Sequence, residues 1–219
     1  MENSNSKKRF TVALVINICV MVLELITCTI SLSTRQYAFK FYTVLSNIFA
    51  GITALIWVIY ALISFGKEIY TVPLWVEELH YYSTCCLTLT FLVAVCMLFP
   101  QEIGVKGFVF AAHHHLGFPT SFFHHLLLPI ASIVSFICFE KKPVTPKKCV
   151  LYAVIPTLLY AVVSLVLNLT KVMDGPYFFL KVYQQPVYMS VVYCVTILCL
   201  ATLLALALHA LNGRHNSKN

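Results

Sequence analysis

The feature that most constrains this chain is a series of six long apolar runs separated by short polar connections. The runs cover about residues 10–32, 41–65, 80–100, 119–139, 149–170 and 187–211. Each is close to the ~20 residues that an α-helix needs to cross about 30 Å of hydrocarbon. Because lipid offers no partners for backbone N–H and C=O groups, runs of this length form helices. The sequence therefore predicts an all-α polytopic membrane protein, a six-transmembrane-helix bundle forming one domain over residues 1–219.

The composition supports a membrane location and argues against a nucleic-acid partner. Of the 219 residues, 60% are hydrophobic and 11% are charged, and the mean hydropathy is +0.85. A soluble domain carries about 25% charged residues, so the excess apolar surface must face lipid. The net charge of +7 comes from short basic clusters between the runs. Such clusters are typical topology signals, and no polar segment is long enough to build a nucleic-acid surface.

The distribution of Lys and Arg predicts the orientation. If the N-terminus is cytoplasmic, ten basic residues lie on the cytoplasmic side and five on the outer side; the five are Arg35, Lys40, Lys106, Lys171 and Lys181. The excess favours cytoplasmic N- and C-termini, in a plasma membrane or a bacterial cytoplasmic membrane. The first run follows basic residues but contains Glu24 and is too long for a signal peptide, so we interpret it as the first span.

Cysteine and proline add two smaller expectations. All nine cysteines lie in the apolar runs or at their edges, so we interpret them as small buried residues and expect no disulfide framework. Pro100 lies at the expected end of the third span, where a missing N–H does little harm. Pro129 and Pro156 lie inside the fourth and fifth spans and predict kinks there.

Polar residues inside the spans are the candidate functional residues, because ionisable groups are costly at membrane depth. They are Glu24, Thr43, Asn47, His80, Thr88, Thr90, His124, His125 and Asn168. At ~1.5 Å of rise per residue, Glu24, Thr43, His124 and Asn168 all fall in the outer half of the bilayer. His80 lies alone near the other side. Four helices thus bring polar groups toward one region.

Structural interpretations of these residues compete with functional ones. A threonine in a span commonly bonds the carbonyl four residues earlier or a neighbouring helix. A histidine near a helix end is often an interfacial residue. Glu24 is compatible with a protonated carboxyl group bonded across helices. Convergence of the four groups favours function over these alternatives.

Four short motifs, in this order and spacing, resemble one known family. They are Lys40–Asn47 (KFYTVLSN), Leu79–Val93, His124–Pro129 (HHLLLP) and Gly175–Leu180 (GPYFFL). Together they resemble the androgen-induced-gene family of six-span membrane proteins and its bacterial relatives. The resemblance implies hydrolysis of fatty acid esters of hydroxy fatty acids by a threonine and a histidine within the membrane. It places the threonine on Thr43 and the histidine on His124. His125 departs from the family pattern and adds a second candidate base.

The resemblance implies a mechanism whose supporting residues are assigned from depth alone. A threonine nucleophile needs a base within hydrogen-bond reach, which we expect to be His124. Glu24 or Asn168 would orient the imidazole, and Asn47, Thr90 or Tyr177 would stabilise the oxyanion. The substrate would be a lipid that enters from the outer leaflet, and we expect no cofactor.

Two rival functions remain open at the level of sequence. A metal-binding protein is suggested by His113, His114 and His115 together with His124 and His125, since imidazole is a common zinc ligand. Adjacent histidine side chains diverge and no carboxylate or cysteine lies nearby in sequence, so we expect no metal. A small transporter would be favoured by inverted repeats or interrupted spans, and neither is evident.

Overall fold

The computed structural model describes residues 2–34, 37–108, 111, 119–140 and 148–216. Six helices in these ranges are long and apolar enough to cross a membrane. They are Ser4–Thr34, Tyr42–Gly66, Leu74–Lys106, Thr120–Cys138, Lys148–Leu169 and Val187–Asn212. The described residues contain no strand. The prediction of an all-α, six-helix membrane protein is therefore confirmed.

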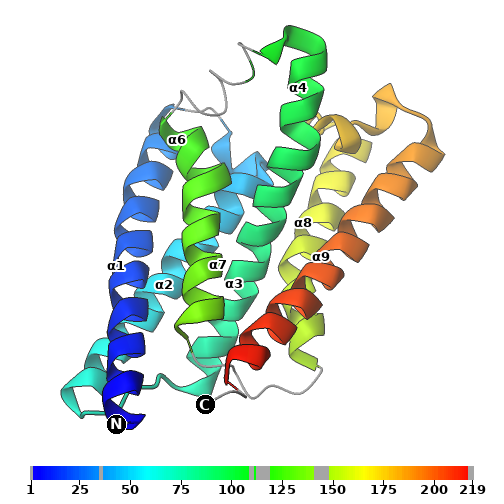
Figure 1. The fold of residues 1–219 in the computed structure, drawn as a ribbon. Helices are drawn as coiled ribbons and strands as arrows, with labels where there is room; N and C mark the ends of the chain where they lie inside the picture. The colour runs from blue at the N-terminus through cyan, green and yellow to red at the C-terminus, as the bar shows by residue number, and fades with distance from the viewer. Residues whose placement is uncertain (1, 35–36, 109–110, 112–118, 141–147, 217–219) are drawn as a thin grey trace.

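The helices pack side by side as one bundle (Figure 1). The elements are α1 (Glu2–Thr34), η1 (Ala38–Lys40), α2 (Tyr42–Gly66), α3 (Leu74–Val93), η2 (Ala94–Leu98), α4 (Phe99–Lys106), α6 (Pro119–Phe122), η4 (Phe123–Leu127), α7 (Leu128–Cys138), α8 (Lys148–Leu169), η5 (Phe178–Leu180), η6 (Val182–Gln184) and α9 (Val187–Asn216). Helix α1 begins and α9 ends at the same end of the bundle, which we call the terminal end. The opposite end, where α2 begins and α8 ends, is the distal end.

The third span differs from the sequence prediction at both ends. It begins at Leu74 instead of residue 80 and continues through Pro100 to Lys106. The expectation that Pro100 ends this span was wrong. A π turn, η2, precedes the proline, with the Phe99 N–H donating to the Ala94 carbonyl five residues earlier. The wider turn lets the helix pass the proline, whose ring would otherwise meet the carbonyl of the preceding turn.

The fourth span repeats this arrangement at Pro129. The Leu128 N–H donates to the Phe123 carbonyl and closes a second π turn, η4, immediately before the proline. A π turn contains one residue more than an α-helical turn and is a recognised cause of kinks. Residues on its N-terminal side are therefore turned by about 100°, one residue's rotation, relative to an uninterrupted helix.

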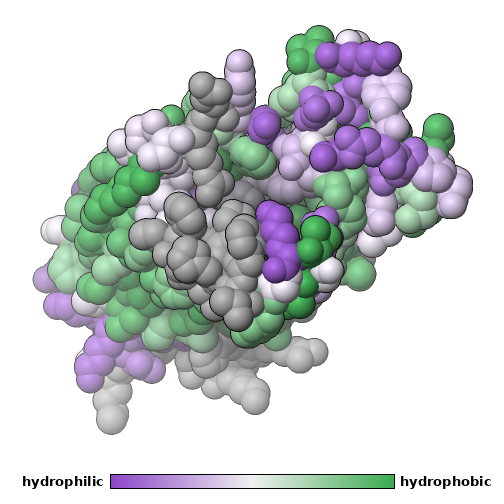
Figure 2. All heavy atoms as spheres, turned by 90° about the horizontal axis from the view of Figure 1, so that it is seen from above, coloured by the Kyte–Doolittle hydropathy of each residue, from purple (hydrophilic) through white to green (hydrophobic). Residues whose placement is uncertain are grey.

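Helix α3 occupies the centre of the bundle and contacts α2, α7, α8 and α9. Its Tyr81 and Leu87 are fully buried, and the Tyr81 hydroxyl donates to the Ala205 carbonyl at 2.7 Å. Helices α8 and α9 bury much less of their surface and expose mainly apolar side chains. Figure 2, a view onto the distal end, shows hydrophobic residues along the flanks and hydrophilic ones gathered near the connection of α8 and α9.

The connection between α8 and α9 is folded back over the distal end. Asn168 holds it, because its amide donates to the Met173 carbonyl at 3.1 Å and accepts from the Val182 N–H at 3.0 Å. A Cβ atom on Gly175 would lie 2.4 Å from the Leu180 carbonyl oxygen, so only glycine fits there. This tight turn places Tyr177 against the start of α2.

Candidate functional site

Thr43 lies in the first turn of α2 at the distal end and is 9% exposed. Asn47 follows one helical turn later on the same face and is fully buried. The Asn47 amide donates to the Thr43 carbonyl at 2.6 Å and to the His124 carbonyl at 3.4 Å. Asn47 thus connects the threonine's backbone to the π turn that carries both histidines.

His125, rather than His124, is the histidine that contacts the Thr43 hydroxyl. Its Nε2 atom lies 3.2 Å from Thr43 Oγ1, within the range expected for a nucleophile and its base. His124 Nε2 instead lies 3.0 Å from Thr27 Oγ1 on α1. The expected pairing of Thr43 with His124 is therefore not the arrangement found. Both histidines lie in the π turn η4, whose extra residue changes the direction in which each ring points.

Tyr177 provides a second polar group beside the threonine. The Thr43 backbone N–H donates to the Tyr177 hydroxyl at 3.3 Å, and Thr43 Oγ1 is 3.3 Å from the same oxygen. The Tyr177 ring stacks on Phe179, with centroids 5.2 Å apart and planes at 10°. The hydroxyl is therefore held in place by its ring and by the folded connection. Tyr177 was expected as a candidate oxyanion donor, and it is adjacent to the proposed nucleophile.

A polar pocket opens beside Thr43, His125 and Tyr177. It has a volume of about 250 Å³. Its lining combines α4 with the distal parts of other spans and includes Gln101, Glu102, Lys106, Ser121, Thr43, His125 and Tyr177. Lys106 Nζ forms an ion pair with Glu102 at 3.2 Å on the rim. Thr43 thus borders a space whose lining combines polar and charged side chains with apolar ones.

A narrow apolar cavity lies on the other side of Thr43 and Tyr177. Its volume is about 50 Å³, and its walls come from α2, α3, α8 and α9. The apolar lining includes Leu89, Val93, Ala161, Ile197 and Leu198. Because Thr43 and Tyr177 line both spaces, the threonine lies at a boundary between polar and apolar surroundings.

A third space, a groove between α2 and α8, adjoins the apolar cavity and has a volume of about 580 Å³. Tyr42 and Tyr160 line both the groove and the cavity. Their rings pack edge to face with centroids 5.1 Å apart. The Tyr42 hydroxyl is 2.8 Å from Thr157 Oγ1, and the Tyr160 hydroxyl donates to the Lys40 carbonyl at 2.7 Å. These two tyrosines form the wall between cavity and groove.

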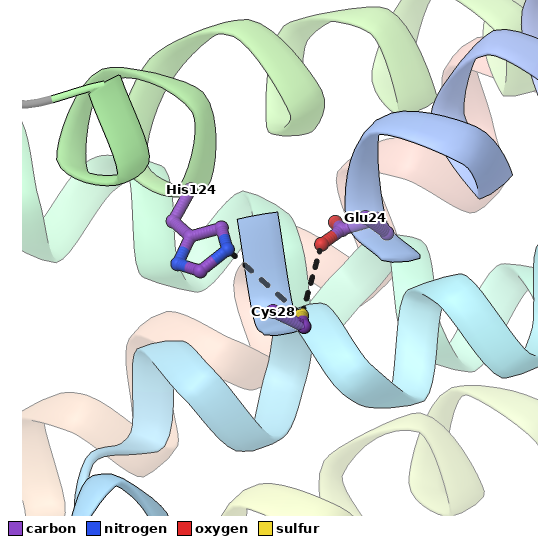
Figure 3. Close-up of side chains that lie close together, drawn as sticks. All are labelled: Glu24, Cys28 and His124. Atoms are coloured by element: carbon purple, nitrogen blue, oxygen red, sulfur yellow. Dashed lines mark hydrogen bonds between the residues drawn. The ribbon is translucent and has the colours of Figure 1, made fainter. Parts of the chain in front are cut away.

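A second polar cluster surrounds His124 (Figure 3). Glu24 and Cys28 lie one turn apart on α1, and the Cys28 thiol donates to Glu24 Oε2 at 3.5 Å. Cys28 Sγ lies 3.9 Å from His124 Nε2. One oxygen, one sulfur and one nitrogen atom of these residues all lie within 4.8 Å of one another, and all three residues are buried. This combination of atoms is one that can hold a metal ion.

The remaining candidate residues are distributed differently from the sequence expectation. Thr90 Oγ1 lies 2.8 Å from Ser46 Oγ, and Thr90 lines the apolar cavity. Asn168 holds the backbone of the α8–α9 connection rather than an imidazole. His80 was expected to be alone near the terminal end, but its Nδ1 is 3.8 Å from Glu140 Oε2. His113, His114 and His115 lie outside the described residues.

Sequence reasoning did not select Thr27, Cys28 or Tyr42 as site residues. Cys28 had been interpreted, with the other cysteines, as a small buried residue. Its spacing of four residues from Glu24 was the available signal, because side chains at i and i+4 share a helix face. Tyr42 carried no comparable signal, since a tyrosine near a span end is usually interfacial.

Comparison of the chain with protein-family models, curated proteins and solved structures finds no match.

Proposed function

We propose that this protein is an intramembrane hydrolase of lipid esters, with Thr43 as the nucleophile and His125 as its general base. The observation that carries the proposal is the 3.2 Å separation of His125 Nε2 and Thr43 Oγ1 at the junction of a polar pocket and an apolar cavity. The motif resemblance to the androgen-induced-gene family supports the same reaction class. The base differs from the resemblance, which points to His124.

In the proposed reaction, Thr43 Oγ1 attacks the ester carbonyl carbon as its proton passes to His125 Nε2. The tetrahedral intermediate collapses, the C–O bond to the alcohol breaks, and His125 returns the proton to the departing alkoxide. Water, deprotonated by His125, then attacks the acyl-threonine, and the proton passes to Thr43 as the acid leaves. This cycle requires His125 Nε2 to be unprotonated at the start.

The start of α2 supplies the groups that would stabilise the oxyanion. The N-cap residue of α2, Phe41, supplies no side-chain cap for the first backbone N–H groups, which lack partners within the helix. One of them, the Thr43 N–H, donates to the Tyr177 hydroxyl. The Tyr177 hydroxyl lies at the same place, 3.3 Å from Thr43 Oγ1. A negative charge that develops next to Thr43 would meet the positive end of the helix dipole and the tyrosine O–H.

The two spaces beside Thr43 favour an ester with one apolar and one polar part. The apolar cavity would receive the acyl chain and widen around it, since its volume is only about 50 Å³. The larger polar pocket would receive the alcohol part, which in a hydroxy fatty acid ester ends in a carboxylate. Lys106 on the rim gives that carboxylate a cationic neighbour, although it already pairs with Glu102.

The groove between α2 and α8 offers a route from the bilayer. Both helices expose apolar side chains on their flanks, among them Ile52, Leu55 and Leu159. A lipid in the groove is separated from the apolar cavity by the rings of Tyr42 and Tyr160. Rotation of these two rings would join the two spaces, so that the ester need not pass through water.

The distal end, which contains Thr43, is proposed to face away from the cytoplasm. This orientation rests on the ten-to-five excess of Lys and Arg on the side of the termini. Reporter domains fused after Asn219 and between Lys106 and Pro119 should report opposite sides of the membrane. The reverse orientation would put the substrate pocket on the cytoplasmic leaflet.

An alkyl fluorophosphonate probe tests the nucleophile directly. Purified protein in lipid nanodiscs should form one covalent adduct, which mass spectrometry should map to Thr43, and the probe should inhibit hydrolysis of a hydroxy fatty acid ester in proportion. Thr43→Ala should remove the adduct. Thr88→Ala is the matched control, because Thr88 is a buried threonine that bonds its own helix at the Thr84 carbonyl. Full hydrolysis by folded Thr43→Ala protein would rule out the proposal.

A further inference from the structure

We propose that Glu24, Cys28 and His124 bind one divalent transition-metal ion of the zinc type inside the bundle. The inference does not rest on the hydrolase proposal, because none of these residues is assigned a chemical step there. It replaces the expectation that the chain binds no metal, which was drawn from the divergence of adjacent histidines and the lack of a carboxylate or cysteine nearby in the sequence.

The three ligand atoms already have nearly the spacing that a zinc ion needs. Zinc bonds to sulfur at about 2.3 Å and to nitrogen or oxygen at about 2.0–2.2 Å, so tetrahedral ligands lie roughly 3.3–3.7 Å apart. Cys28 Sγ is 3.5 Å from Glu24 Oε2 and 3.9 Å from His124 Nε2. All three atoms lie within 4.8 Å of one another. Small side-chain rotations would bring them onto one ion.

The Glu24 carboxylate has one unsatisfied oxygen atom. Glu24 is 1% exposed, and its Oε1 atom has no hydrogen-bond partner. A buried polar atom without a partner is costly, and more so in a helix surrounded by hydrocarbon. A divalent cation would satisfy that oxygen, and its charge would balance one carboxylate and one thiolate. The site would then be neutral overall, as its position inside the membrane requires.

The packing of α1 against α2 and the π turn η4 bring the three ligands together. Glu24 and Cys28 lie on the same face of α1, four residues apart. A Cβ atom on Gly51 of α2 would lie 3.1 Å from the Glu24 Cβ, so glycine permits the close approach that places the carboxylate. His124 enters from the π turn η4, and π turns are frequent at functional sites.

The fourth ligand position lies toward Thr27. Its hydroxyl donates to the Leu23 carbonyl at 2.8 Å, so the hydroxyl oxygen accepts from His124 Nε2–H at 3.0 Å in the metal-free protein. Metal binding requires the His124 proton on Nδ1 and removes the thiol proton of Cys28. Metal affinity should therefore rise with pH. Bound metal would also fix the π turn, which carries His125.

Cobalt titration of purified, metal-stripped protein tests this site without measuring hydrolysis. The background variant should carry His113→Ala, His114→Ala and His115→Ala, so that the histidine run cannot bind the ion. We expect one Co²⁺ per chain, a thiolate-to-cobalt charge-transfer band in the near ultraviolet, and visible bands typical of tetrahedral cobalt. Zinc added afterwards should abolish these bands by displacement.

Substitutions in the same background assign the ligands. Cys28→Ser should remove the charge-transfer band, whereas Glu24→Gln and His124→Ala should weaken Co²⁺ binding by about tenfold or more. Cys85→Ser is the matched control, because Cys85 is equally buried in α3 but lies outside the cluster. It should keep the band. Gly51→Ala should weaken binding by moving Glu24.

A measurement on Cys28 in the background protein tests the site without a ligand substitution that could prevent folding. Metal should slow alkylation of Cys28 by a small membrane-permeant maleimide and raise the melting temperature of the background protein, because an ion that binds only the folded state stabilises it. A band that survives in folded Cys28→Ser protein, or Cys28 alkylation unchanged by metal, would contradict the proposal. The cluster would then be a hydrogen-bond network only.

Discussion

The bundle contains a buried polar network at each end, and the two differ in what surrounds them. At the distal end, Thr43 and His125 border a polar pocket and an apolar cavity. Toward the terminal end, the Asn17 amide donates to Ser135 Oγ at 3.1 Å and to Glu140 Oε1 at 2.9 Å, and Ser135 donates to Glu140 at 2.7 Å. None of these three lines the pockets described above.

Burial of polar groups is therefore a poor guide to function in this protein. Both networks contain a histidine and a carboxylate or hydroxyl group, and both are covered by apolar helices. The terminal-end network joins α1 to α7 through side chains that bond one another, as structural polar groups in membranes commonly do. The distal network instead leaves Thr43, the proposed nucleophile, at the edge of two open spaces. Five substitutions test whether the two networks have different roles.

Removal of the proposed catalytic pair should have the largest effect on turnover. Thr43→Ala and His125→Ala should each lower kcat/KM for a hydroxy fatty acid ester by roughly 10³-fold or more. The double variant should lose little beyond either single variant, because the two groups act in one proton transfer. Initial rates in nanodiscs measure this, with melting temperatures as the folding control. Additive losses would show that the residues act separately.

Tyr177→Phe should have the next largest effect. The change removes only the hydroxyl that lies 3.3 Å from Thr43 Oγ1 and retains the ring that stacks on Phe179. Loss of an oxyanion donor typically lowers kcat by about 10²-fold. We expect kcat to fall with KM little changed. A rise in KM alone would assign Tyr177 to substrate binding.

Ala161→Leu should alter selectivity more than rate. Ala161 lines the apolar cavity, and a larger side chain there would fill space proposed for the acyl chain. The ratio of kcat/KM for a long-chain over a short-chain p-nitrophenyl ester should fall about tenfold. The short-chain ester is the internal control. An unchanged ratio would place the acyl chain elsewhere.

Glu140→Ala at the other end should leave kcat nearly unchanged but lower stability. The change removes the carboxylate that accepts from the Ser135 hydroxyl, and one of the three acceptors of the Asn17 amide, which keeps the Ala13 carbonyl and Ser135 Oγ. A buried group left unpaired costs about 1–3 kcal/mol. The melting temperature should fall, whereas kcat of the folded fraction should remain within about twofold of the original. A catalytic loss in folded Glu140→Ala protein would make the terminal-end network functional and overturn the comparison.

The sequence by itself determined the helical membrane fold, because hydrocarbon leaves a long apolar run no alternative to a helix. For five of the six predicted spans, most ends lie within a few residues of the ends of the observed helices. The sequence also placed Thr43 at one end of the bundle, since depth follows directly from position along a span, and Tyr177 in the connection after the fifth span. The predicted end of the third span at Pro100 was wrong, because a proline ends a helix only where the backbone cannot form a wider turn before it.

Only the tertiary structure decided which side chains meet. His124 and His125 are neighbours in sequence, and their directions depend on a π turn whose additional residue rotates both rings. Cys28 became a candidate ligand only when the π turn brought His124 to the face of α1 that carries Glu24. The spacing of apolar residues and their hydropathy locate a residue along a helix axis. The rotation of one helix against another follows from packing, which is a property of the whole bundle.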